Sequence, residues 1–142
     1  MISDPTRPIL LVEDNPVDLD LTLRAFAHHN LASPIQVARD GQEALDWIPR
    51  WGAGETLPLV ILLDLKLPRV DGLEVLRQLR EHPVSRDLPV VVLTSSSEDR
   101  DVKAAYALHA NSYIVKPVNF EKFMDVAAQI KLYWLLINHL PE

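Results

Sequence analysis

The chain has 142 residues, of which 48% are hydrophobic and 24% are charged, so its length and composition predict one globular domain. Its formal net charge of −6 argues against non-specific nucleic-acid binding, which requires a basic surface. The absence of cysteine excludes disulfides and thiolate metal sites. The longest apolar runs are about half the length of a membrane span, and residues 1–8 contain no apolar signal region. We expect a cytoplasmic protein that binds neither membranes nor nucleic acid.

Strand and helix signals alternate along the first half of the chain. Short apolar runs predict buried strands, and capping residues before amphipathic stretches predict helix starts. In chain order, the expected elements are a strand at Ile9–Val12, a helix from the N-cap Asn15 to about His28, a strand at Ile35–Ala38, and a helix through Ala44, Leu45 and Ile48 that ends before a surface loop at 51–56.

The same alternation continues in the second half. The expected elements are a strand at Leu59–Leu63, a helix at about Leu73–Glu81, a strand at Val90–Leu93, a helix through Val102, Ala105 and Leu108 with N-cap choices at Ser95, Ser96 and Ser97, a strand at Ser112–Val115, and a helix capped by Asn119 that runs to about Leu140. Five strand–helix repeats predict a doubly wound α/β fold with a parallel sheet and helices on both faces.

Polar residues follow four of the predicted strands. Glu13 and Asp14 follow the first, Asp64 the third, Thr94 the fourth and Lys116 the fifth. Each alone is commonly a cap, a loop residue or a solvated lysine, but parallel strands bring their carboxyl ends to one edge of the sheet. Three converging carboxylates repel one another unless a cation binds, and hard oxygen ligands favour Mg²⁺ or Mn²⁺. The pattern therefore predicts a site that handles a phosphoryl group.

Four segments carry a resemblance to a known family. They are Val12-Glu13-Asp14-Asn15, the run from Leu63 to Gly72, Leu93-Thr94-Ser95, and Val115-Lys116-Pro117. With these segments the chain resembles the receiver domain of two-component response regulators over essentially its full length. The resemblance implies a flavodoxin-like (βα)5 fold with strand order 2-1-3-4-5, and one receiver domain spanning residues 1–142.

The resemblance also implies how phosphorylation would proceed. Asp64 would be the phosphoacceptor, while Glu13 and Asp14 would form an acidic metal pair for Mg²⁺. Asp64 and the main-chain carbonyl of Lys66 would be further metal ligands. The donor would be a phosphohistidine on a sensor histidine kinase.

Other residues take further roles by the same resemblance. Lys116 would form an ion pair with the phosphoryl group, and Thr94 would hydrogen-bond one of its oxygens. Tyr113 falls at the family's aromatic switch position, where it would rotate into the space that Thr94 vacates. The peptide bond before Pro117 would be cis in the family, although the sequence alone allows either isomer.

The expected last helix, about 119–140, is apolar on two faces, and a helix of that kind buries both. We interpret its second face, with Tyr133, Trp134, Leu135 and Leu136, as a homodimer interface; the alternative is that the tail folds back on its own domain. The segment Lys131–Leu135, followed by Leu140-Pro141, resembles single-domain regulators paired with bacterial phytochromes. That likeness implies a light-sensing histidine kinase as partner.

The sequence therefore predicts a stand-alone response regulator that catalyses only its own phosphoryl uptake and loss. A small Mg²⁺-dependent phosphatase is one alternative, but Lys66 stands where such an enzyme would carry a second aspartate after Asp64. A phosphorylation-independent interaction module is the other alternative. The presence of all the residues expected for phosphoryl uptake argues against it: Glu13, Asp14, Asp64, Thr94 and Lys116.

Overall fold

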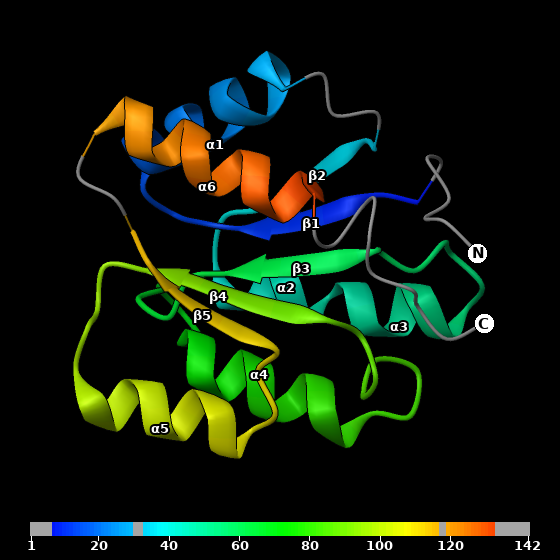
Figure 1. Cartoon of the computed structure of the whole chain (residues 1–142). Coiled ribbons are helices and arrows are strands. Elements are labelled where there is room, and N and C mark those ends of the chain that lie inside the picture. Colours follow the sequence, from blue (N-terminus) through cyan, green and yellow to red (C-terminus); the bar gives the residue numbers. More distant parts are fainter. Residues whose placement is uncertain (1–6, 30–32, 117–118, 133–142) are drawn as a thin grey trace.

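A five-stranded parallel sheet forms the centre of the computed structural model, which describes residues 7–29, 33–116 and 119–132. The strands lie in the order β2-β1-β3-β4-β5 (Figure 1). Their bounds are Ile9–Val12 for β1, Ile35–Ala38 for β2, Val60–Leu63 for β3, Val90–Thr94 for β4 and Ser112–Val115 for β5. The predicted fold class and strand order are both confirmed.

Six helices lie on the two faces of the sheet in the described part of the chain. They are α1 at Pro16–His28, α2 at Gly41–Leu45, α3 at Trp47–Gly52, α4 at Gly72–Glu81, α5 at Asp99–Ala107 and α6 at Phe120–Ile130. Helices α1 and α6 cover one face, and α2 to α5 cover the other (Figure 1). Within the described residues, no helix combines the length and apolar character needed to cross a membrane.

The core is divided by the sheet into two hydrophobic clusters. Along β1, Leu10 and Val12 join the cluster beneath α2 to α5, while Ile9 and Leu11 join the cluster beneath α1 and α6. Because both faces are covered, every residue of β1 is buried, and the strand reads as a continuous apolar run.

The strand register brings the predicted site residues level with one another. In the central pairing of β1 with β3, Val12 lies opposite Leu63. The residues that come directly after these two positions are Glu13 and Asp64, so their backbones leave the sheet side by side. The carboxyl edge of the sheet is therefore where the site has to be sought.

Helix starts agree with the sequence at two predicted caps and differ at one. The Asn15 side chain accepts hydrogen bonds from the first turn of α1, and the Asn119 side chain does the same for α6. The predicted serine caps of α5 are wrong, because α5 begins at Asp99 with Glu98 as its N-cap. The Ser96 hydroxyl instead lies 2.5 Å from Asp101 Oδ2, in a buried contact.

Two further predictions concern residues 51–56 and the end of the last helix. The loop predicted at 51–56 is wrong for its first two residues, because Trp51 and Gly52 belong to α3. Trp51 is 3% exposed and packs in the core, with its ring stacked on Trp47. The extension of the last helix to about Leu140, with the dimer residues Tyr133, Trp134, Leu135 and Leu136, lies outside the described residues.

Candidate functional site

Three carboxylates meet at the carboxyl edge of the sheet. Glu13 follows β1, Asp14 comes next to it, and Asp64 follows β3; one carboxylate oxygen of each lies within 4.8 Å of the others. Glu13 is 2% exposed and Asp64 is 5% exposed, while Asp14 is open to solvent. The structure therefore brings together the carboxylates that the sequence placed at one edge, and two of them are buried.

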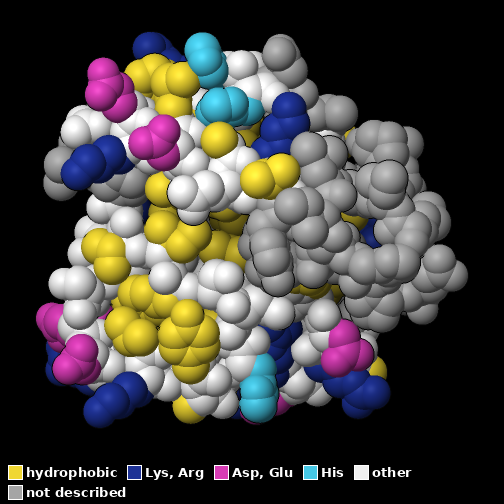
Figure 2. All heavy atoms as spheres, viewed as in Figure 1, with side chains coloured by type: hydrophobic (Ala, Val, Ile, Leu, Met, Phe, Trp, Pro, Cys, Tyr) yellow, Lys and Arg dark blue, Asp and Glu magenta, His cyan; other side chains and the backbone are white. Residues whose placement is uncertain are grey.

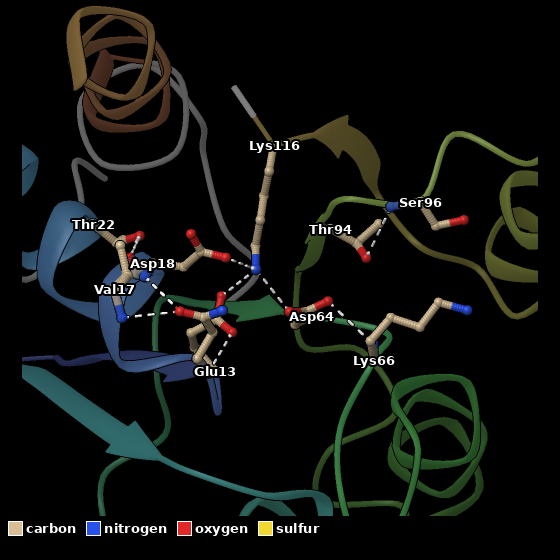
Figure 3. A network of polar contacts seen from close by, with 10 residues as sticks. Glu13, Val17, Asp18, Thr22, Asp64, Lys66, Thr94, Ser96 and Lys116 are labelled. Carbon is tan, nitrogen blue, oxygen red and sulfur yellow. Dashed lines mark hydrogen bonds and ion pairs between the residues drawn. The ribbon is translucent and has the colours of Figure 1, made fainter. Parts of the chain in front are cut away.

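Lys116 enters this cluster from the end of β5. Its ammonium nitrogen lies 2.5 Å from Glu13 Oε1 and 2.8 Å from Asp64 Oδ2. It also lies 2.8 Å from Asp18 Oδ2, and Figure 3 shows the side chain reaching in between Asp18 and Asp64. The Lys116 side chain is only 6% exposed, so a buried cation stands among three carboxylates.

Asp18 is the site residue that sequence reasoning missed. It lies in the first turn of α1, and it contacts a lysine 98 residues further along the chain. The one available signal was an acidic residue in a first helical turn, which many helices carry because the macrodipole favours a negative charge there. That signal is too common to identify a partner of Lys116.

Burial and charge shift two pKa values within the cluster. Burial raises the pKa of Glu13 to about 7; the Asp64 charge adds to this effect, and the hydrogen bond from Lys116 opposes it. Burial by itself disfavours the Lys116 charge, but hydrogen bonds to Asp18, Asp64 and Glu13 together hold the pKa of Lys116 above its ordinary value. The ammonium therefore stays protonated, while burial favours the protonated form of Glu13 more than that of an exposed glutamate.

The segment after Asp64 is held against the Asp64 side chain by its backbone. The Lys66 main-chain N–H donates to Asp64 Oδ1 at 3.1 Å, while the Lys66 side chain extends away from the site (Figure 3). The Gly72 N–H donates to the Leu65 carbonyl at 2.9 Å. A Cβ on Gly72 would lie 2.2 Å from the Asp64 carbonyl oxygen, so only glycine lets α4 approach this closely.

Thr94 and Tyr113 are joined through the loop that follows β4. Thr94 is fully buried, and its hydroxyl accepts a hydrogen bond from the Ser96 N–H at 3.4 Å. The Tyr113 hydroxyl donates to the Ser96 carbonyl at 2.8 Å, and partial burial raises the Tyr113 pKa. Ser96 thus contacts both predicted switch residues. Pro117, with its predicted cis peptide, lies outside the described residues.

The donor set defines what the site can do chemically. Its ligand atoms are hard carboxylate oxygens, which suit Mg²⁺ or Mn²⁺. Asp64 presents a carboxylate nucleophile, and Lys116 supplies a fixed positive charge beside it. A cation site next to a nucleophile and an ammonium is what phosphoryl transfer requires.

Comparison with known proteins assigns the chain to a family. The family model for the response regulator receiver domain matches residues 9–128. The chain therefore belongs to the response regulator receiver family of two-component systems, whose domains are signalling modules.

Two relatives are similar over most of their length. The probable methanogenesis regulatory protein FilR2 of Methanothrix harundinacea is 46% identical over 134 residues, which cover 94% of this chain and 86% of that protein. The response regulator Rcp1 of Synechocystis sp. is 37% identical, with 98% of this chain and 96% of Rcp1 covered.

Solved structures agree with these sequence relatives. The phosphorylated cyanobacterial phytochrome response regulator RcpA matches with a TM-score of 0.89 at 36% identity, covering 96% of this chain and 99% of RcpA. The Mn²⁺-bound form of Rcp1 matches with a TM-score of 0.86 at 36% identity and the same coverage. The chain is thus close to phytochrome response regulators in both sequence and fold.

Proposed function

We propose that Asp64 accepts a phosphoryl group from a sensor histidine kinase, and that the domain then signals through protein contacts. The observation that carries this proposal is the Lys116 ammonium, which contacts both Glu13 and Asp64 inside a buried carboxylate cluster. Membership of the receiver family supports it, as does the likeness to RcpA, which was solved in phosphorylated form.

The chain's own residues account for the transfer step. One Asp64 carboxylate oxygen forms a bond to phosphorus, while the bond from phosphorus to the donor imidazole nitrogen breaks and that nitrogen keeps the electron pair. Lys116 faces the charge that gathers on the phosphoryl oxygens, and the Thr94 hydroxyl donates to one of them. In this proposal catalysis is limited to the domain's own phosphoryl uptake and loss.

A divalent cation fits the carboxylate cluster. Glu13, Asp14 and Asp64 would hold Mg²⁺ together with the Lys66 main-chain carbonyl, and Mn²⁺ would serve as well; the Mn²⁺-bound form of Rcp1 supports this assignment. When bound, the cation neutralises charge on the transferring phosphoryl group. The fit rests on the donors, because buried Glu13 and Asp64 repel each other as anions and gain from a cation.

The Thr94–Ser96–Tyr113 contacts offer a path from the site to the surface. A phosphoryl group on Asp64 would attract the Thr94 hydroxyl away from the Ser96 N–H. Tyr113 would then exchange its hydrogen bond to the Ser96 carbonyl for a position nearer the core. This change would alter the face formed by α5 and β5, where Figure 2 shows hydrophobic side chains gathered and where Tyr106 and Val115 are exposed.

The partners follow from the same likenesses. We infer a phytochrome-type histidine kinase as donor, on the basis of RcpA, and a cytoplasmic location for this chain. We infer a homodimer through Tyr133, Trp134, Leu135 and Leu136, because Leu132, which is 53% exposed, belongs to the same apolar stripe of the sequence. We also propose that the peptide bond before Pro117 is cis, as in the family, and that residues 1–142 form one receiver domain.

Phosphotransfer profiling tests this function. The chain would be incubated with autophosphorylated histidine kinases, a bacterial phytochrome among them, and label on the chain would be followed with time. We expect rapid transfer from the phytochrome kinase to the wild type and to the control Asp99→Asn, whose substituted residue is exposed on α5. Asp64→Asn should remain unlabelled. Transfer to Asp64→Asn at the wild-type rate would contradict the proposal.

A further inference from the structure

Lys116 has three carboxylate partners, and they differ in what the proposed reaction does to them. An ammonium has three N–H donors, and here these face Glu13, Asp18 and Asp64. Glu13 and Asp64 also belong to the carboxylate cluster that suits a cation, but Asp18 does not. Asp18 is therefore the one partner of Lys116 that has no other proposed role in the site.

The Asp18 carboxylate is held in place by a fixed stretch of α1. The Asp18 N–H donates to the Asn15 side chain at 3.1 Å, and the Asp18 carbonyl accepts the Thr22 hydroxyl at 2.8 Å. Thr22 is 4% exposed and Leu19 is 6% exposed, so this turn is packed against the domain. The Asp18 side chain itself is 27% exposed, so it is more open to solvent than those of Glu13 and Asp64.

We propose that Asp18 is a positioning residue for Lys116, an inference that rests on the proposed function of Asp64. During phosphoryl uptake Asp64 becomes an acyl phosphate and no longer offers a free carboxylate, while Glu13 turns to the cation. Two of the three partners of Lys116 thus change, and Asp18 is the one that keeps its acceptor oxygen in position. It holds the ammonium beside the acceptor, where the phosphoryl oxygens gain charge.

Two other roles for Asp18 would leave different signatures. As a favourable charge at the start of α1, it would affect stability alone. As a competing anion that draws Lys116 away from the acceptor, it would slow phosphoryl uptake through its charge. Asp18→Asn removes the charge and keeps an oxygen that accepts a hydrogen bond, whereas Asp18→Ala removes both. Comparing the two variants therefore separates positioning from charge.

The test uses acetyl phosphate, a small donor that needs no docking to α1. Initial rates of labelling with Mg²⁺ would be followed by intact mass for the wild type, Asp18→Ala, Asp18→Asn and the control Asp20→Ala. Asp20 lies on the same helix in an exposed pair with Arg24. Asp20→Ala changes the net charge by the same amount as Asp18→Ala. Ala is the strongest helix former, so neither alanine variant should break the helix. Each rate is measured at a temperature below the unfolding midpoint of that variant. Asp18→Leu is a second variant without an acceptor, and it does not shorten the side chain.

We expect the variants that lose the acceptor oxygen to differ from the one that keeps it. At saturating donor, Asp18→Ala and Asp18→Leu should label about tenfold more slowly, as for the loss of one charge-assisted hydrogen bond at the reacting group. Asp18→Asn should stay within about twofold of the wild type by the same reasoning, and Asp20→Ala should match the wild type.

Each contrary result has its own meaning. A wild type that takes no label would defeat the proposed function of Asp64, and this inference with it. A labelled wild type with Asp18→Ala at the Asp20→Ala rate would overturn the role of Asp18 alone. Asp18→Asn slowed as much as Asp18→Ala, or both variants accelerated, would show that Asp18 acts through its charge and not by positioning.

Discussion

Replacing Lys116 by methionine should destabilise the cation-free domain strongly. Lys116→Met keeps the length of the side chain but removes the one cationic side chain that, among the described residues, contacts the buried Glu13 and Asp64 carboxylates. These two side chains are 3% and 5% exposed, so little water solvates their charges once the ammonium is removed. Breaking a buried ion pair from one side costs about 3–5 kcal/mol, a large share of the roughly 5–15 kcal/mol that stabilises a typical domain.

The assay is urea and thermal unfolding at pH 8 without divalent cations, followed by circular dichroism. We expect the midpoint temperature of Lys116→Met to fall by roughly 10–15 °C. The matched control is Lys103→Met, which makes the same change at an exposed position of α5 and should move stability by less than about 0.5 kcal/mol. An unfolding free energy for Lys116→Met equal to or above that of the wild type would refute the view that Lys116 neutralises the cluster.

Three more outcomes follow from the same contacts. In the folded protein the pKa of Glu13 is about 7, above its ordinary 4.5, so folding favours the protonated side chain. This contribution to stability is full below pH 4.5 and is lost as the pH rises to 7. Without cations the unfolding free energy should therefore fall by up to about 3 kcal/mol across this window; an equal slope in Glu13→Gln would contradict this. Gly72→Ala should cost about 1–3 kcal/mol in urea unfolding because its Cβ meets the Asp64 carbonyl, whereas Gly52→Ala, with open space around its Cβ, should not destabilise. Tyr113→Phe should lose about 1 kcal/mol with its hydrogen bond to Ser96; unchanged stability would argue against that contact.

The sheet could be predicted from the sequence because its three central strands, β1, β3 and β4, are buried on both faces. Their apolar runs stand out at Ile9–Val12 and 59–63, and the observed strands differ from the predicted ones by at most one residue at an end. Parallel pairing then determines which residues share an edge. For this reason the amino-acid sequence alone places Glu13, Asp14 and Asp64 together, although their chemical roles stay predictions.

The features that the sequence did not reveal depend on packing between distant segments. Asp18 lies in the first turn of α1, and its partner Lys116 follows β5, 98 residues further along the chain. Ser96 looks like a helix cap locally, but its hydroxyl meets Asp101. Trp51 precedes two glycines typical of a loop, yet it is buried among core residues. In each case the partner is chosen by tertiary structure rather than by neighbouring residues.

The most direct test of the account is Mg²⁺-dependent labelling by acetyl phosphate, read as intact mass. The wild type should gain the mass of one phosphoryl group with Mg²⁺ and gain nothing when the cation is chelated. Asp64→Asn should gain nothing under either condition, and peptide mapping should place the group on Asp64. Labelling of Asp64→Asn to the wild-type extent would contradict the assignment of Asp64 and its carboxylate cluster as the acceptor site. Wild-type labelling that is unchanged when Mg²⁺ is chelated would contradict it too.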